Sequence, residues 1–214
     1  MNVMKVCSRK LLDILRLRSF NVLRNSEYLQ TTGWFNSFKH RQAVDSTGKA
    51  VPWLAYPVSS FLQQRLNGEM SVFEYGCGNS SLWLAERVKR LICCEHDSVW
   101  YERMTSLAPS NVSIICRDTE SGEYCGEIGK YHHEFDVIII DGEDRVNCIK
   151  NSPEALKEGG IIILDDSFRD EYQVGKDFLA LNGFKSIEIT GPTPIYFNFG
   201  ATTIFYRDTN CFNL

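Results

Sequence analysis

The sequence predicts an α/β protein built around a mostly parallel β-sheet that ends in an antiparallel hairpin. Residues 72–97 read as a strand, a tight glycine turn, a helix and a second strand ending on an acid, the first half of a nucleotide-binding α/β sheet. Two runs are typical of parallel strands buried on both faces: residues 161–164, which are all apolar, and residues 135–140, which are apolar except for Asp136. Residues 184–190 alternate as a strand, and a loop separates them from a last strand at 201–206, so we expect these two to form the hairpin.

Each part of the first segment has a physical role. Gly76 and Gly78 allow positive φ angles and let a ligand approach the backbone without a Cβ atom in between. The helix that follows begins with free N–H groups, which favour polar or anionic ligand atoms. Glu95 ends the second strand about 20 residues after the first glycine, a spacing at which an acid accepts hydrogen bonds from both hydroxyls of a ribose.

The glycine pattern differs from that of dinucleotide-binding proteins. Ser81 stands where the third glycine of G-x-G-x-x-G would fall, and Glu74 lies two residues before the first glycine. The stretch resembles the first motif of class I S-adenosylmethionine-dependent methyltransferases. The resemblance implies that the acid and the glycines hold the methionine part of S-adenosylmethionine, and that the acid of the second strand binds its ribose. The implied cofactor-binding residues here are Glu74, Gly76, Cys77, Gly78, Asn79, Ser80, Glu95 and His96.

The resemblance extends over residues 58–207 by the order and spacing of motifs. It implies a Rossmann-like three-layer sandwich, with a mostly parallel seven-stranded sheet and a C-terminal antiparallel hairpin. Residues 1–57 would then form a basic helix and an aromatic lid segment rather than an independent domain, and residues 208–214 would form a tail. In this family a polar residue after the third strand (112–116) often hydrogen-bonds the adenine, and Asp118 has that position.

Helical spacing and terminal residues predict the remaining elements. Residues 58–66 have helical spacing and are expected to cover the sheet before the first strand. Ser98 is a candidate N-cap of a helix that ends near Leu107. Another helix is expected at 168–181, where Gly183 provides a C-terminal stop.

Three carboxylates follow two neighbouring buried strands. Asp141 follows the fourth strand, and Asp165 and Asp166 follow the fifth. Ligands bind beyond the carboxyl ends of the strands in an open α/β sheet, so we expect all three to face the cofactor crevice. Asp141 is the first candidate both for chemistry and for a cofactor contact. The cluster predicts either a bound Mg²⁺, which prefers oxygen ligands, or neutralisation by Arg145 and Arg169.

The resemblance also bears on the reaction. Some small-molecule O-methyltransferases of this class, related to catechol and macrolide-sugar O-methyltransferases, use such acids to hold a metal that binds the acceptor hydroxyl. Ser167 departs from the Asp-Asn pair of the catechol type. We expect methyl transfer to a hydroxyl of a small molecule or a glycan sugar, with Asp141 and Asp166 as catalytic residues. The acceptor contacts are expected from the aromatic segment at 28–57 and from the loop at 191–200.

Composition narrows the range of partners. The net charge of −4 argues against non-specific nucleic-acid binding, and no apolar run approaches the roughly 18 residues of a membrane span. The 8 cysteines form no C-x-x-C pair, which argues against zinc and is typical of a reduced, cytoplasmic protein. Residues 1–24 are basic, which suits either an anionic membrane surface or a helix packed on the domain or on a partner. No feature specifies the oligomeric state.

Two other kinds of function remain open at this level. The same sheet also suits an aminopropyltransferase or an NAD-dependent oxidoreductase, although the missing third glycine argues against NAD and no acidic diamine pocket can be identified. A non-catalytic S-adenosylmethionine-binding partner or scaffold subunit is the other alternative. Asp141 and the Asp165-Asp166 pair favour an intact active site.

Overall fold

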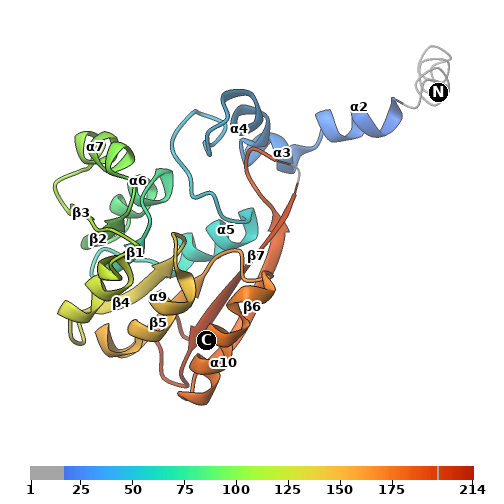
Figure 1. Cartoon of the computed structure of the whole chain (residues 1–214). Helices are drawn as coiled ribbons and strands as arrows, with labels where there is room; N and C mark the ends of the chain where they lie inside the picture. Colours follow the sequence, from blue (N-terminus) through green and yellow to red (C-terminus); the bar gives the residue numbers. More distant parts are fainter. Residues whose placement is uncertain (1–16, 197) are drawn as a thin grey trace, which may run out of the picture.

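The computed structural model describes residues 17–196 and 198–214, and one sheet of seven strands forms its centre (Figure 1). The order across the sheet is β3-β2-β1-β4-β5-β7-β6. The first five strands pair in parallel, whereas β7 pairs antiparallel with both β5 and β6. This confirms the predicted fold class. The strands are β1 (Ser71–Tyr75), β2 (Arg90–Glu95), β3 (Val112–Cys116), β4 (Phe135–Ile140), β5 (Leu156–Leu164), β6 (Lys185–Pro192) and β7 (Phe199–Tyr206).

The strand order reverses next to β1. The chain proceeds from β1 to β2 and β3 on one side and returns to place β4 on the other side of β1. Loops that follow β1 and β4 therefore diverge at this point and leave a crevice beyond the carboxyl ends of the two strands. The residues that follow β1, β2, β4 and β5 all lie at this edge of the sheet.

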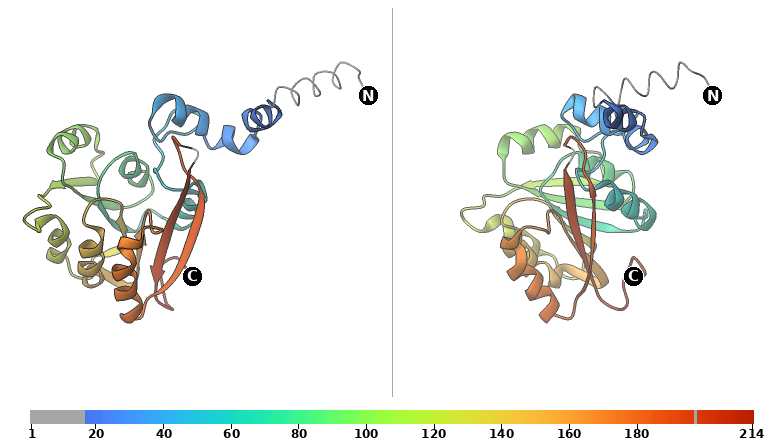
Figure 2. Two further views of the ribbon diagram at one scale, coloured as in Figure 1. Left: turned by 45° about the vertical axis from the view of Figure 1, so that its right-hand side comes forward. Right: turned by 90° about the vertical axis from the view of Figure 1, so that its right-hand side faces the viewer.

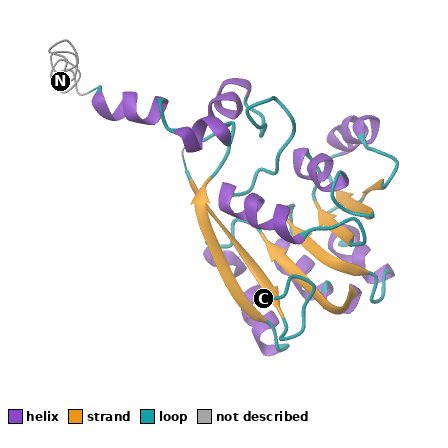
Figure 3. Cartoon of the chain, turned by 180° about the vertical axis from the view of Figure 1, so that it is seen from behind, coloured by secondary structure: helices purple, strands orange, loops and turns teal. Residues whose placement is uncertain are grey.

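Helices cover both faces of the sheet (Figures 1 and 3). One face packs against α5 (Tyr56–Arg65) and α6 (Asn79–Ala85), and the opposite face packs against α9 (Arg145–Asn151) and α10 (Gln173–Leu181). The shorter α8 (Glu123–Gly126) joins the second face. The helix α7 (Ser98–Leu107) contacts β2 and β3.

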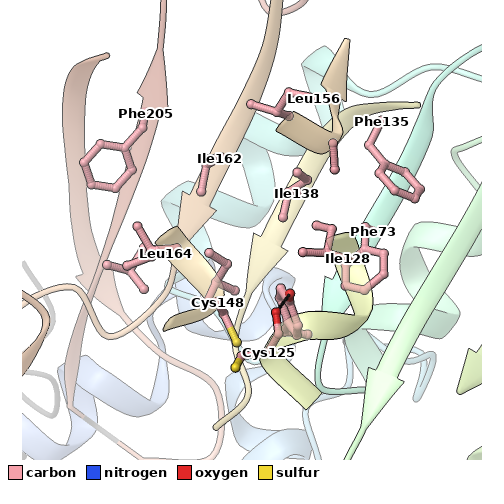
Figure 4. Packing of buried hydrophobic residues seen from close by; sticks show 14 of the residues in the cluster. Phe73, Cys125, Ile128, Phe135, Ile138, Cys148, Leu156, Ile162, Leu164 and Phe205 are labelled. Carbon is pink, nitrogen blue, oxygen red and sulfur yellow. Dashed lines mark hydrogen bonds between the residues drawn. The ribbon is translucent and has the colours of Figure 1, made fainter. Parts of the chain in front are cut away.

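Residues 137–140 and 161–164 are consecutive apolar residues because the central strands are buried on both faces there. In β4, Ile138 and Ile140 belong to one core cluster, and Val137 and Ile139 belong to the other. Figure 4 shows the first cluster, in which Ile138 lies between Phe73 and Ile162. Burying each such aliphatic side chain contributes roughly 1.5–3 kcal/mol, so a polar residue at any of these positions would be costly.

The N-terminal segment is partly helical. The aromatic segment at 28–57 includes most of α3 (Glu27–Thr31) and all of α4 (Trp34–His40). Before them, α2 (Arg18–Arg24) has no buried residue and projects from the body of the protein (Figure 2). The predicted basic helix at 1–24 lies outside the described residues over most of its length.

Several predicted boundaries differ from those of the structure. The fifth strand begins at Leu156 rather than at Ile161. The helix α7 is capped by Asp97 rather than Ser98, because the Asp97 carboxylate accepts the N–H of Trp100 at 2.8 Å. The helix expected at 168–181 begins only at Gln173, since a 3-10 turn (Asp170–Tyr172) precedes it. Residues 208–214, which we predicted to form a tail, pack on the domain through Phe212. Phe212 is fully buried and packs edge-on against Phe61 with ring centroids 5.9 Å apart.

Two further observations concern membranes and thiols. Within residues 17–196 and 198–214, no helix combines the length and the apolar character needed to cross a bilayer. The cysteines in the same part of the chain all carry free thiols.

Candidate functional site

The turn between β1 and α6 is shaped by two glycines that act differently. Gly76 has a φ of 90°, in the left-handed region, and a Cβ atom on it would lie 3.0 Å from the backbone oxygen of Asp141. A side chain at Gly76 would therefore push the turn away from the loop after β4. Gly78 has extended backbone geometry, and a Cβ atom on it would meet open space. Gly78 keeps the space above the turn free.

Glu74 holds this turn from below. Its side chain is only 1% exposed and accepts a hydrogen bond from the Ser81 hydroxyl at 2.5 Å. The Ser81 hydroxyl oxygen in turn accepts the N–H of Gly78 at 3.0 Å. Burial raises the pKa of Glu74 to about 7, against the opposing effect of hydrogen bonds from Ser80 and Ser81. Glu74 therefore supports the turn from inside the protein, and its predicted cofactor contact would act through the turn.

This buried carboxyl predicts a pH-dependent stability. The folded protein binds the Glu74 proton more tightly than the unfolded chain, so wild-type stability falls as pH rises from the ordinary value of 4.5 to about 7. Glu74→Gln removes this effect, and the variant should gain about 3 kcal/mol relative to wild type across the window. Urea unfolding at several pH values measures it, with the exposed Glu86→Gln as control. Parallel stability curves for wild type and Glu74→Gln would contradict it.

Glu95 holds the other side of the turn. Its carboxylate is 4% exposed and accepts the Cys77 N–H at 3.1 Å and the N–H groups of His96 and Asp97 at 2.8 and 2.9 Å. The His96 ring nitrogen Nδ1 lies 3.1 Å from the same carboxylate. The structure therefore brings Glu95 to the glycine turn, as the spacing predicts. Its contact with a ribose stays a prediction.

A cleft of about 470 Å³ lies over this turn, and we call it the glycine-turn cleft. Two contacts shape it. The Trp100 indole donates to the backbone oxygen of Cys77 at 2.6 Å, and the Asn79 amide donates to the backbone oxygen of Ala43 at 2.7 Å. The second contact ties the N-terminal segment across the start of α6. The cleft is lined by Arg41, Gln42, Ala43, Trp53, Cys77, Gly78, Asn79, Ser80, Trp100, Arg103, Met104, Leu107, Asp141 and Ile195.

A second cavity, of about 410 Å³, adjoins the cleft, and we call it the aspartate cavity. Trp53 and Asp141 line both spaces. The loop after β6 closes one side, where the Trp34 indole donates to the backbone oxygen of Tyr196 at 3.4 Å. The aromatic segment and the loop at 191–200 thus both contribute to the lining of this cavity. Their contact with an acceptor stays a prediction. Its lining is Trp53, Asp141, Asp165, Asp166, Phe168, Thr193, Tyr196, Asn198, Phe199 and Gly200.

The three aspartates meet in this cavity, but each has its own partner. Asp141 pairs with Arg145 at 3.1 Å, and Asp166 pairs with Arg169 at 2.6 Å. Asp165 accepts a hydrogen bond from the Thr202 hydroxyl at 2.6 Å, and its side chain is 7% exposed.

Burial and mutual repulsion change the acidity of two of these carboxyls. Burial first, and then the neighbouring Asp165, raises the pKa of Asp141 well above its usual value, although Arg145 opposes the shift. Burial also raises the pKa of Asp165 to about 6, against the effect of the Thr202 hydrogen bond. Both carboxyls therefore bind a proton more readily than a surface aspartate.

The predicted Mg²⁺ site at Asp141, Asp165 and Asp166 is not supported. Among the described residues, no group of three or more His, Cys, Asp or Glu side chains is placed to hold a metal ion. The alternative that we left open accounts for two of the charges, because Arg145 and Arg169 occupy the positions where a cation would neutralise the cluster.

For two residues the structure and the sequence-based prediction of the site disagree. Asp118 is exposed and accepts the Ser121 N–H at 2.7 Å, and it lines neither the cleft nor the cavity, so its predicted adenine contact lacks support in this geometry. Trp100 was missed. The only sequence signal for Trp100 was its position in the first turn of the helix after Glu95. An aromatic residue at such a position is as often an ordinary surface residue as part of a site.

Comparison with known proteins gives a consistent result. A family model described as a methyltransferase domain matches residues 73–167, which run from within β1 to Ser167, the residue after the aspartate pair. Carboxy-S-adenosyl-L-methionine synthase from Shewanella baltica is 21% identical over 200 residues, which cover 79% of this chain and 81% of the relative.

Solved structures share the fold at low sequence identity. Precorrin 8W decarboxylase from Methanobacterium thermoautotrophicum aligns with a TM-score of 0.57 and 16% identity, covering 78% of this chain and 97% of the other. Spermidine synthase from Thermotoga maritima aligns with a TM-score of 0.54 and 20% identity over 74% of this chain. The chain spans only 58% of the length of the spermidine synthase.

Proposed function

The chain belongs to the class I S-adenosylmethionine-dependent methyltransferases, and we propose that it methylates a hydroxyl group of a small molecule or glycan sugar held in the aspartate cavity. The observation that carries this proposal is the position of Asp141. Its carboxyl group lines both the glycine-turn cleft and the aspartate cavity, so it stands where the contents of the two spaces would meet.

The glycine-turn cleft fits S-adenosylmethionine. Backbone groups of the turn and the Asn79 and Ser80 side chains offer polar contacts, while Trp100, Met104 and Leu107 offer an apolar wall for an adenine ring. Glu95 lies directly under Cys77, at the end of β2 where the family pattern expects the ribose. When bound, S-adenosylmethionine supplies a methyl group on a positively charged sulfur, which makes that methyl electrophilic.

The chain's own contribution is positioning and proton removal. Holding the acceptor oxygen in line with the methyl group makes the encounter intramolecular, an effect worth roughly 7–11 kcal/mol in well-oriented systems. The acceptor hydroxyl must also lose its proton. We assign Asp141 to that role, because a carboxyl with a raised pKa is a stronger base once ionised. Asp166 is the second candidate, although it lines only the aspartate cavity.

The charge of the aspartate cavity supports a small acceptor rather than a nucleic acid. Its described lining contains three carboxylates and no Lys, Arg or His side chain. A phosphate backbone would be repelled there, since proteins bind nucleic acids mainly through Lys and Arg. The net charge of −4 would also repel a nucleic acid, over longer distances.

Blocking the glycine-turn cleft tests the proposal. Gly78→Val places a side chain in open space within the cleft, so it should remove binding of S-adenosylhomocysteine, measured by calorimetry, without lowering the melting temperature. Gly68→Val is the matched control, because a Cβ atom on Gly68 also meets open space but lies outside the cleft. Wild type and Gly68→Val should bind S-adenosylmethionine and S-adenosylhomocysteine and not NAD.

Two results would count against this assignment. Unchanged S-adenosylhomocysteine affinity in Gly78→Val would move the cofactor to another part of the protein. Preference of the wild type for NAD would remove the premise of methyl transfer.

A further inference from the structure

The aspartate cavity has aromatic walls that methyl transfer to a hydroxyl does not by itself require. Trp53, Phe168, Tyr196 and Phe199 line it, with 49%, 57%, 47% and 76% of their respective surfaces exposed. Exposed apolar groups that gather around a cavity usually mark a ligand or partner site. Aromatic rings offer apolar contact area, and their faces also attract cations.

The charges in the cavity are only partly balanced. Arg145 pairs with Asp141, and Arg169 pairs with Asp166. No ion pair joins Asp165 to a Lys, Arg or His among residues 17–196 and 198–214. Asp165 is buried, with 7% of its surface exposed, and its Oδ1 accepts the Thr202 hydroxyl. Arg145 is close enough to stabilise the negative charge of Asp165, but it donates to the backbone oxygen, at 2.7 Å, and forms its ion pair with Asp141. A positively charged ligand group in the cavity that Asp165 lines would supply the ion pair that this buried carboxylate does not make within the described residues.

The cofactor does not supply this missing charge. Asp141 lines the glycine-turn cleft as well as the cavity, so Asp141 is the aspartate that the positively charged sulfur of a cofactor in the cleft would face. Asp165 and Asp166 line the aspartate cavity alone. The cavity carboxylate that makes no ion pair within the described residues, Asp165, therefore lies on the acceptor side of the site.

We propose that the acceptor carries a positively charged amino group, which binds between Asp165 and the aromatic walls of the aspartate cavity. An amine-bearing small molecule, such as an amino sugar or an aromatic amine, matches both features. The inference rests on the proposed function only for the statement that an acceptor occupies this cavity. It assigns Asp165 to recognition of the amine and leaves the reacting hydroxyl next to Asp141.

Matched probes of different charge test this inference. The full-length protein is saturated with S-adenosylhomocysteine at pH 7.5, and the affinities of benzylamine, benzyl alcohol and benzoate are measured by calorimetry. The three probes share one ring, so they differ mainly in charge. We expect benzylamine to bind at least about fivefold more tightly than benzyl alcohol, and benzoate to bind most weakly.

Variants assign the preference to the cavity. Asp165→Asn keeps an oxygen for the Thr202 hydroxyl but loses the charge, and it should remove the preference for benzylamine while affinity for benzyl alcohol stays the same. Asp177→Asn on the exposed surface of α10 is the matched control and should behave as wild type.

The inference is overturned if benzylamine and benzyl alcohol bind equally, if none of the probes binds, or if Asp165→Asn retains the preference. The titration with S-adenosylhomocysteine that precedes each measurement reports the cofactor site separately. A failure there would count against the proposed function, whereas normal cofactor binding without amine preference would count against this inference alone.

Discussion

Asp141→Asn is expected to lower the rate of methyl transfer by about 100-fold or more, because the amide cannot accept the proton of the acceptor hydroxyl. The amide oxygen can still accept the hydrogen bond from Arg145, so the loop after β4 should keep its shape. S-adenosylhomocysteine affinity should fall by no more than about 150-fold, because losing one hydrogen bond to a charged group costs roughly 1.5–3 kcal/mol. The rate is measured as transfer of a labelled methyl group from S-adenosylmethionine to the small-molecule fraction of a cell extract.

A nearby aspartate provides the control for this experiment. Asp144 lies three residues further along the chain and lines neither the cleft nor the cavity. Its φ of 47° is one that asparagine also adopts readily, so Asp144→Asn should leave rate and binding unchanged. The raised pKa of Asp141 also predicts that the wild-type rate rises with pH as this carboxyl group loses its proton. This rise should be absent in Asp141→Asn. A rate in Asp141→Asn close to that of wild type would transfer the role to Asp166.

The fold was predictable because its strongest signals are local. The central strands are buried on both faces, so β4 appears in the sequence as a run that is apolar except for Asp136, and its two ends were predicted correctly. Boundaries set by capping were less visible. Asp97 and Ser98 are both good N-caps by residue type, and only the position of the carboxylate relative to Trp100 decides between them. The burial of Phe212 against Phe61 depends on a contact between distant parts of the chain, which no local pattern records.

The candidate site was predictable in outline for a related reason. Parallel strands bring their carboxyl ends to one edge, so the approach of Asp141 to Asp165 and Asp166 follows from topology. Topology does not say which direction a side chain takes. The side chain of Glu74, for example, lies beneath the turn and not in the cleft. Two of the aspartates likewise pair with arginines, Arg145 and Arg169, and not with a metal. The contact of the Trp100 indole with the backbone oxygen of Cys77 could not be predicted for the same reason, since it depends on the direction of a side chain.

Gly142→Ala is expected to destabilise the protein by about 2–4 kcal/mol, because the loop after β4 leaves no room for a side chain. A Cβ atom there would overlap the Tyr124 hydroxyl and lie 3.0 Å from the backbone nitrogen of Gly76. The Tyr124 ring is fully buried and cannot move aside. The melting temperature should fall by about 5–15 °C, and calorimetry measures the change.

A second substitution shows whether this overlap is the cause. The Tyr124 hydroxyl is buried and has no hydrogen-bond partner among the described residues, so Tyr124→Phe alone should leave stability equal or higher. In combination with Gly142→Ala it should restore a large part of the lost stability, because it removes the overlapping atom. Tyr75→Phe is the matched control. The Tyr75 hydroxyl donates to the backbone oxygen of Cys125 at 2.8 Å, so losing it should destabilise the protein and restore nothing. If Tyr124→Phe recovers no more stability than Tyr75→Phe, the strain lies in the backbone contact with Gly76 instead.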